Sequence, residues 1–198
     1  MWGRGDIRFF DTVSYVYDIF MPSPDIDRIH SAFAESDLPK TEVVIDLAGG
    51  TGRVARSLGG VRSVVIDVSR GMLVKARRHN LDLIHGDASN LPLFSGSVDA
   101  VVCVDAFHHL PNGEGASEEV RRVLRPGGVF VIVDFDPTTI RGRFISFFER
   151  LVGMNSKFYT PNEVALVLEK AGFETRIRET GFEYVVVGKK GGSDKEPS

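Results

Sequence analysis

The sequence holds a single cysteine, Cys103, in 198 residues, so neither a disulfide framework nor a cysteine-rich zinc site is available. We expect no metal, and the lack of disulfides fits a reducing cytoplasm. An excess of basic charge is also missing, because 24 lysines and arginines stand against 27 acids, a net charge of −3. Nucleic acid is therefore not an expected partner, since phosphate backbones are bound by clustered cationic side chains.

Long apolar runs are absent as well. No stretch reaches the length of a membrane span, and the N-terminal residues lack the apolar core and cleavage site of a signal peptide. With 42% hydrophobic and 26% charged residues, the composition is that of a soluble globular domain. Without a repeat or linker, we predict one domain over residues 1–190 and a disordered tail over 191–198, as a monomer or homodimer.

Apolar, β-branched runs alternate with helical patterns, which predicts parallel strands joined by helices. The strands are continuously apolar, as in a sheet covered on both faces, and lie at Val43–Leu47, Ser63–Asp67, Leu81–His85, Ala100–Asp105 and Val129–Phe135. Helices are predicted near Val54–Leu58, Met72–Arg78 and Glu118–Leu124, and the last of these would be stopped by Pro126. A further helix is predicted to begin after the N-cap Thr160 and to end at Gly172.

Two further strands, near Glu174–Arg178 and Tyr184–Val187, would form an antiparallel hairpin at the sheet edge. The predicted fold class is α/β: a doubly wound, Rossmann-like sheet of seven mostly parallel strands with a helical N-terminal extension. Residues 1–40 form the predicted lid, in which a helix begins at Ser23-Pro24. They include a helical face of Phe10, Val13, Tyr17 and Phe20.

Residues 138–160 form a predicted cap insertion after the fifth strand. Its apolar face, with arginines around it, consists of Phe144, Phe147, Phe148 and Leu151. Such a face suits an aromatic or lipidic acceptor, or a membrane surface. Burial against the chain's own domain is the preferred interpretation.

The segment VVIDLAGGTGR, residues 43–53, joins an apolar run to one acid and three glycines. In open α/β sheets, ligands bind beyond the carboxyl ends of the strands, which is where this loop falls. Glycine permits sharp turns and close approach of a ligand. A loop of this kind on its own predicts a plain strand–helix turn about as readily as a binding site.

Acids follow four successive predicted strands at the same edge of the sheet: Asp46, Asp67, Asp87 and Asp105. A carboxylate at Asp67, 21 residues after Asp46, is placed to accept hydrogen bonds from ribose hydroxyls. Acids would repel a pyrophosphate and attract a cation, so the pattern favours a positively charged nucleoside ligand. The loop also lacks the G-x-G-x-x-G spacing of a nicotinamide-dependent oxidoreductase.

Several segments together resemble class I S-adenosylmethionine-dependent methyltransferases, in particular the small-molecule type 11 members that include the ubiquinone/menaquinone C-methyltransferases. They are VVIDLAGGTGRVA, VVIDVSRGMLVKAR, HGDASNLPLFSGSVDAVVCVDAFHHL, EVRRVLRPGGVFVIVDF and FYTPNEVALVLEKAGF. The resemblance implies S-adenosylmethionine as cofactor and S-adenosylhomocysteine as product. The family usually has glycine where this chain has Ala48, the smallest possible change.

The resemblance also implies contacts to the methionine part of the cofactor and its sulfonium. The residues concerned are Asp46, the loop of Ala48, Gly49, Gly50, Thr51 and Gly52, and Val104 and Asp105 near the sulfonium. For the adenosine part, Asp67 would bind the ribose, Val68 and Met72 would lie against the adenine, and Asp87 and the Ala88 backbone would meet its amine and ring nitrogen.

Methyl transfer from a sulfonium mainly requires alignment and exclusion of water, with a base only where the acceptor must lose a proton. His108 and His109 in DAFHHL are candidate bases, with His109 preferred, and the alternative is that neither moves a proton. Tyr17 could reach over the sulfonium or belong to ordinary packing. The quinone enzymes typically have an Arg-Asn pair where His-His stands here.

The predicted activity is C- or O-methylation of a small, apolar or aromatic acceptor (EC 2.1.1.-). The alternative is a non-catalytic S-adenosylmethionine-binding protein that regulates or binds a partner.

Overall fold

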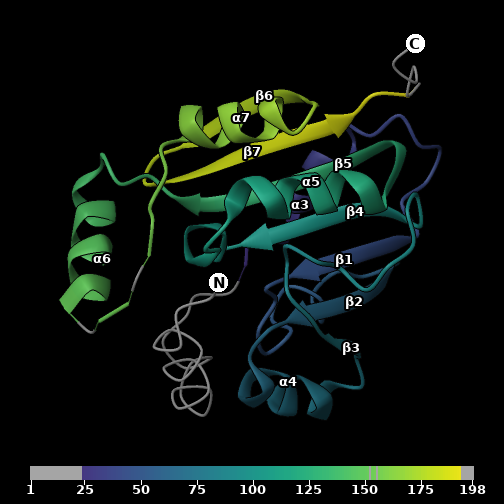
Figure 1. The fold of residues 1–198 in the computed structure, drawn as a ribbon, viewed down its shortest axis with the longest axis horizontal. Coiled ribbons are helices and arrows are strands. Elements are labelled where there is room, and N and C mark those ends of the chain that lie inside the picture. The colour runs from purple at the N-terminus through teal and green to yellow at the C-terminus, as the bar shows by residue number, and fades with distance from the viewer. Residues whose placement is uncertain (1–23, 152, 155, 193–198) are drawn as a thin grey trace.

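The computed structural model describes residues 24–151, 153–154 and 156–192. Seven strands form one sheet in the order β3-β2-β1-β4-β5-β7-β6 (Figure 1). They are β1 Val43–Leu47, β2 Arg62–Asp67, β3 Asp82–His85, β4 Val98–Val104, β5 Leu124–Phe135, β6 Phe173–Thr180 and β7 Glu183–Lys190. Strands β1 to β5 pair in parallel, and β7 runs antiparallel to both β5 and β6. The predicted fold class and the C-terminal hairpin are confirmed.

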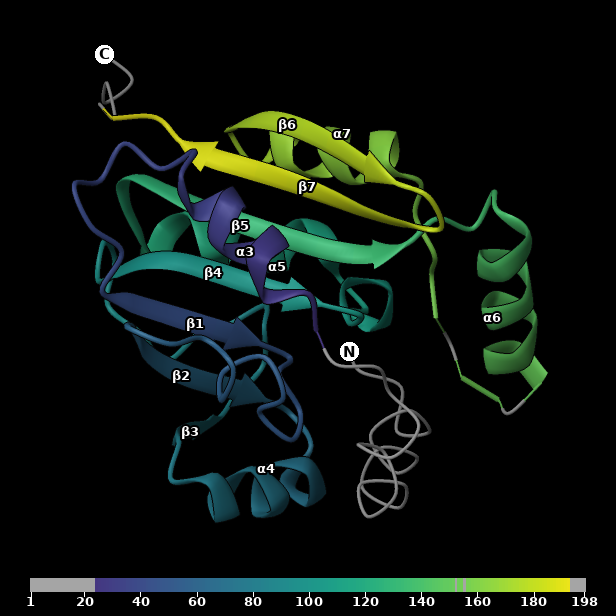
Figure 2. The same ribbon diagram turned by 180° about the vertical axis from the view of Figure 1, so that it is seen from behind.

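Helices cover both faces of this sheet. They are α3 Ile26–Phe33, α4 Arg70–Ala76, α5 Gly113–Val123, α6 Ile140–Leu151 and α7 Pro161–Lys170, with short 3₁₀ turns η1 Arg77–His79 and η2 Phe107–His109. Figures 1 and 2 show α5 and α7 on one face of the sheet and α3 on the other, with α6 standing apart from the sheet. The two main core clusters lie on these two faces.

Apolar side chains on both faces explain why the central strands read as continuous hydrophobic runs. Val101 and Phe130 belong to the cluster with α5 and α7, whereas Val102 and Val131 belong to the cluster with α3. All four are completely buried. The parallel register then brings the carboxyl ends of β1, β2 and β4 to one edge of the sheet.

The helix predicted near Val54–Leu58 is wrong: residues 51–57 form hydrogen-bonded turns. The backbone N–H of Ala55 donates to Asp46 Oδ2 at 2.9 Å, where a regular helix would use the carbonyl four residues back. The loop around the first acid therefore takes the place of a helical turn.

Two other boundaries differ from the predictions. Helix α5 begins at Gly113, because Asn112 caps it by accepting from Gly115 N. It ends at Val123, and β5 starts at the next residue, Leu124. Pro126 therefore lies inside the first residues of β5, not in a turn before it. At α7, Thr160 and Glu163 form the predicted capping box.

The predicted N-terminal lid falls largely outside the described residues. Residues 1–23, including Tyr17, are not described, and the same holds for the predicted tail beyond residue 192. The helix expected from Ser23-Pro24 begins at Ile26, after the N-cap Asp25, whose side chain accepts from Arg28 N. In the part of the chain that the structure describes, no helix is long and apolar enough to cross a bilayer.

Candidate functional site

A cavity lies at the carboxyl ends of β1, β2 and β4. Its walls contain most of the predicted cofactor residues: Asp46, Ala48, Gly49, Gly50, Thr51, Asp67, Val68, Met72, Val104 and Asp105. His109 also lines it, together with four residues for which the sequence analysis assigned no role: Arg53, Val54, Ser69 and Ala106. Four predicted site residues, Gly52, Asp87, Ala88 and His108, are not among the lining residues.

The loop after β1 turns sharply because three of its residues have positive φ: Ala48 at 53°, Gly50 at 56° and Gly52 at 76°. The turn is fixed by a backbone hydrogen bond from Ala48 N to Ile66 O at 2.7 Å. Gly49 does not need a positive φ, but a Cβ there would meet the Asp46 carboxylate. The glycines therefore allow a left-handed turn, and they allow the loop backbone to lie against the Asp46 carboxylate.

Asp46 is the buried acid at the end of β1, and its side chain closes the loop by accepting from Ala55 N. Burial, together with the nearby charge of Asp67, raises the pKa of this carboxyl to about 7, against the lowering effects of the Ala55 hydrogen bond and of Arg53. A cation placed in the cavity would therefore strongly favour the ionised form of this carboxyl.

Asp67 uses both carboxylate oxygens to organise the two loops around it. Oδ2 accepts from Gly50 N at 2.8 Å, and Oδ1 accepts from Ser69 N at 2.7 Å. A carboxylate offers about four acceptor positions in all. Asp67 therefore joins the glycine loop to the loop after β2 while it lines the cavity.

Arg53 and Asp105 form an ion pair in the wall of the cavity, with Nη2 and Oδ2 3.1 Å apart and both side chains about nine-tenths buried. Burial and the charge of Asp134 raise the pKa of Asp105 to about 6, against the lowering effect of Arg53. Sequence reasoning missed Arg53, although its place at the end of the glycine loop, opposite several acids, was the available signal.

The predicted residues outside the cavity have other contacts. A Cβ on Gly52 would meet the Leu81 side chain, so this glycine packs the loop against the sheet. Asp87 Oδ1 accepts from Ser89 N at 2.9 Å and stabilises the turn after β3, whereas Ala88 is buried in the core. Their predicted contact with an adenine stays a prediction.

The two histidines differ in position. His109 lines the cavity, and its Nδ1 lies 3.1 Å from Ser156 Oγ. His108 is fully buried behind it, stacked on Phe158, with Nδ1 2.6 Å from Asp134 Oδ1. The two adjacent histidines therefore have separate surroundings, one at the cavity and one in the protein interior.

Glu149 of α6 reaches both histidines. Its Oε1 lies 3.4 Å from His108 Nε2 and 3.9 Å from His109 Nε2. Burial alone would lower the pKa of His108, but Asp134 and Glu149 raise it to about 10, so this imidazole is a cation between two carboxylates. Burial, together with the His108 charge, lowers the pKa of His109 to about 3, and that ring is neutral.

Among the described residues, His108, His109 and Glu149 are the one set whose ligand atoms, within 4.8 Å of one another, could hold a metal ion. The positive charge of His108 already compensates Glu149, and its Nδ1 is taken by Asp134. The arrangement is that of an ion-paired anchor for α6.

Replacement of Ala48 by glycine is expected to raise the free energy of unfolding by up to about 1 kcal/mol. Alanine at φ 53° carries the cost of the left-handed conformation, which glycine avoids, and the greater unfolded-state entropy of glycine offsets part of the gain. Denaturant unfolding of Ala48→Gly measures the difference. The same change at Ala55, where no positive φ is found, serves as the control and should destabilise; a loss of stability in Ala48→Gly would contradict the assignment of strain.

The fold is shared with solved methyltransferase structures. Residues 45–132 match the family model described as "Methyltransferase domain", in agreement with the resemblance found in the sequence. The chain is 40% identical over 103 residues to demethylmenaquinone methyltransferase of Paenarthrobacter aurescens, a match over 50% of this chain and 41% of that protein.

A second relative is phthiotriol/phenolphthiotriol dimycocerosates methyltransferase 1 of Mycobacterium ulcerans, 39% identical over 49% of this chain and 37% of that protein. The chain thus spans about half the length, or less, of these curated relatives. Among solved structures, an S-adenosylmethionine-dependent methyltransferase of Thermotoga maritima has a TM-score of 0.74 at 23% identity, over 96% of this chain and 100% of that chain, which shows the shared fold.

Proposed function

We propose that the protein is an S-adenosylmethionine-dependent methyltransferase that methylates carbon or oxygen of a small, apolar or aromatic acceptor, with S-adenosylhomocysteine as the second product. The observation that carries the proposal is the charge of the cavity. Three carboxylates, Asp46, Asp67 and Asp105, face it with one cation, Arg53. In a partly desolvated cavity this excess of negative charge favours a sulfonium cation over a pyrophosphate.

The residues present fit this cofactor. Asp67, which lines the cavity, would accept hydrogen bonds from the ribose hydroxyls, and Met72 and Val68 would supply apolar contact for the adenine. Asp46 and the backbone of the glycine loop would surround the methionine part. When bound, the cofactor supplies an activated methyl group on a sulfonium, a good leaving group for in-line displacement.

The role of the chain's own residues is then to hold the acceptor in line and to exclude water. We assign the task of orienting the acceptor to His109, whose ring faces the cavity and is neutral with a pKa of about 3. A neutral ring of such low basicity orients a hydroxyl by hydrogen bonding better than it removes a proton. Asp105, with a pKa of about 6, is a stronger proton acceptor than His109.

His108 serves as a positioning residue, because it is buried and held by Asp134 and Glu149. The proposed contact of Tyr17 with the sulfonium concerns a residue outside the described part of the chain.

The proposed class of acceptor is supported by the names of two relatives, which are methyltransferases named for demethylmenaquinone and for phthiotriol/phenolphthiotriol dimycocerosates. The His-His pair, where quinone enzymes typically have Arg-Asn, favours an acceptor other than the quinone itself.

Affinity for S-adenosylmethionine is expected to fall as the pH is lowered from 7.5 to 5. Asp46 and Asp105, with pKa values of about 7 and 6, become protonated over this range, and only their ionised forms attract the sulfonium. Each group contributes at most about a tenfold loss per pH unit below its pKa. Calorimetric titration at several pH values measures this, and Asp46→Asn should show the shallower dependence. An affinity that is constant with pH would contradict the charge argument.

The activity is tested by incubating the protein with methyl-labelled S-adenosylmethionine and a panel of phenols, quinols and long-chain alcohols. Transfer of label to one class, lost in Asp67→Asn, is the expected result. Tight cofactor binding without transfer to any acceptor would instead favour the non-catalytic alternative.

A further inference from the structure

The outer face of α6 is an exposed apolar stripe made of Ile140, Phe144, Phe147, Phe148 and Leu151. These side chains are 83%, 75%, 66%, 61% and 70% exposed. At 100° per residue they fall within an arc of about 100° along the whole helix, the pattern of an amphipathic helix. The expectation that this face packs on the chain's own domain is wrong for the described residues. We call this face the α6 stripe.

The inner face of α6 fixes the direction in which the stripe points. Glu149 lies opposite the stripe and reaches His108 and His109. Gly142 is buried, and a Cβ there would meet the carbonyl oxygen of Asp136, so the helix backbone sits directly on the chain that follows β5. The helix is therefore held by one side, and its apolar side faces outward.

Charge on the helix is distributed unequally between these two faces. Glu149 is its single acid and points inward, whereas Arg141, Arg143 and Arg150 are exposed. Arg143 and Arg150 border one edge of the stripe by helical angle, and Arg141, whose guanidinium lies 5.5 Å over the Phe182 ring, borders the other. The outward half of α6 is apolar along its centre and positive along both edges.

We propose that the α6 stripe docks on the surface of an anionic lipid bilayer. Phenylalanines and leucine with flanking arginines are the composition that lies in the headgroup and acyl boundary, and cationic side chains add attraction to anionic lipids. The local charge pattern favours an anionic membrane surface, because the exposed arginines border the stripe and no acid lies on this face of the helix. The inference does not depend on methyl transfer.

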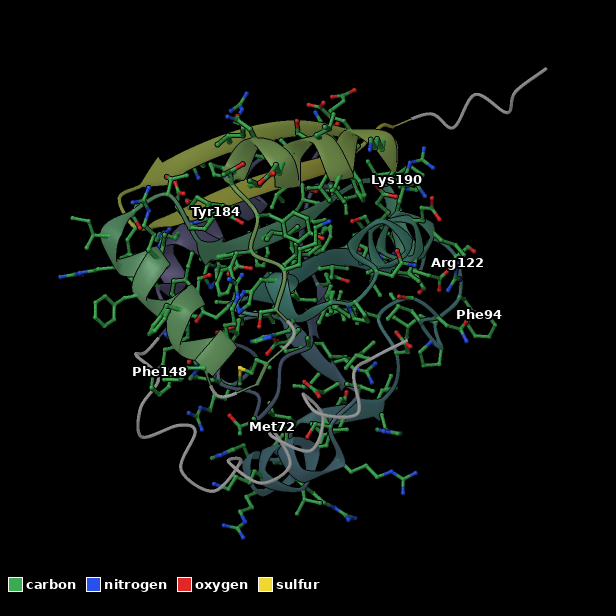
Figure 3. The ribbon with its side chains drawn as sticks, turned by 60° about the vertical axis from the view of Figure 1, so that its left-hand side comes forward. Met72, Phe94, Arg122, Phe148, Tyr184 and Lys190 are labelled. Atoms are coloured by element: carbon green, nitrogen blue, oxygen red, sulfur yellow. The ribbon has the colours of Figure 1, made fainter. Side chains whose placement is uncertain are left out.

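The test is co-sedimentation of the full chain with vesicles of phosphatidylglycerol and phosphatidylcholine, compared with phosphatidylcholine alone. We expect binding to the anionic vesicles that weakens with salt, and at least a tenfold loss of binding in Phe144→Ser/Phe148→Ser. The matched control is Phe94→Ser: Phe94 is 88% exposed and lies far from Phe148 in the molecule (Figure 3), so its loss should leave binding unchanged. Arg143→Gln/Arg150→Gln should weaken binding to anionic vesicles specifically.

Two results would overturn the proposal. One is failure of the wild-type chain to sediment with anionic vesicles. The other is a stripe variant that binds vesicles as the wild type does but changes from dimer to monomer by light scattering, which would make the stripe a contact between copies. Circular dichroism and cofactor titration of each variant verify that the fold and the cavity are intact, so a failure here is separate from a failure of the proposed activity.

Discussion

Replacing Gly49 by alanine is expected to lower the affinity for S-adenosylmethionine at least 100-fold. The added Cβ would lie 2.6 and 2.7 Å from the two carboxylate oxygens of Asp46, much closer than atoms pack. Asp46 cannot move away without losing its hydrogen bond to Ala55 N, so the loop has to shift. We expect a destabilisation of about 1–3 kcal/mol from this overpacking.

Calorimetric titration and thermal unfolding of Gly49→Ala measure the two effects. Gly59→Ala is the matched control, because it lies after the same loop, lacks a positive φ and has no heavy atom within 4 Å of the added Cβ. This control should bind the cofactor as the wild type does. Wild-type affinity in Gly49→Ala would show that the contact between the loop backbone and Asp46 does not shape the binding site.

Replacing Asp67 by asparagine is expected to weaken cofactor binding by roughly 100-fold. The carboxylate now accepts from both Gly50 N and Ser69 N, and an amide of the same shape has one acceptor oxygen for these two donors. Losing a hydrogen bond to a charged group costs about 1.5–3 kcal/mol, and the change also removes one of the proposed ribose acceptors.

Asp82→Asn is the control for this change. Asp82 is an exposed strand residue paired with Arg62 at 2.8 Å, and removing such a surface pair should have little effect on binding or stability. Titration with S-adenosylmethionine of both variants gives the comparison. Equal affinities for the two variants would contradict the role assigned to Asp67.

The strands could be predicted because each central strand is buried on both faces and therefore carries an unbroken apolar run. The grouping of the cavity acids followed from them, because the end of a parallel strand fixes the sheet edge at which Asp46, Asp67 and Asp105 meet. The helix at Val54–Leu58 failed for a physical reason. Its first donor is bound by Asp46, a contact that local periodicity does not encode.

The charged partners around the site were beyond local sequence patterns. Glu149 lies 40 residues after His109 in the chain, and only the placement of α6 brings it to both histidines. Asp134 at the end of β5 likewise acts on His108 across the fold. The outward direction of the α6 stripe depends on the same placement, since an amphipathic pattern specifies which residues share a face and not what that face meets.

The acid-lined cavity is proposed to bind S-adenosylmethionine. The most direct measurement is calorimetric titration of the wild-type chain with S-adenosylmethionine, S-adenosylhomocysteine and, for comparison, a reduced nicotinamide dinucleotide. We predict one site with a dissociation constant in the micromolar range for both adenosyl compounds and no binding of the dinucleotide. A folded protein that binds neither adenosyl compound, or that binds the dinucleotide instead, would contradict the account.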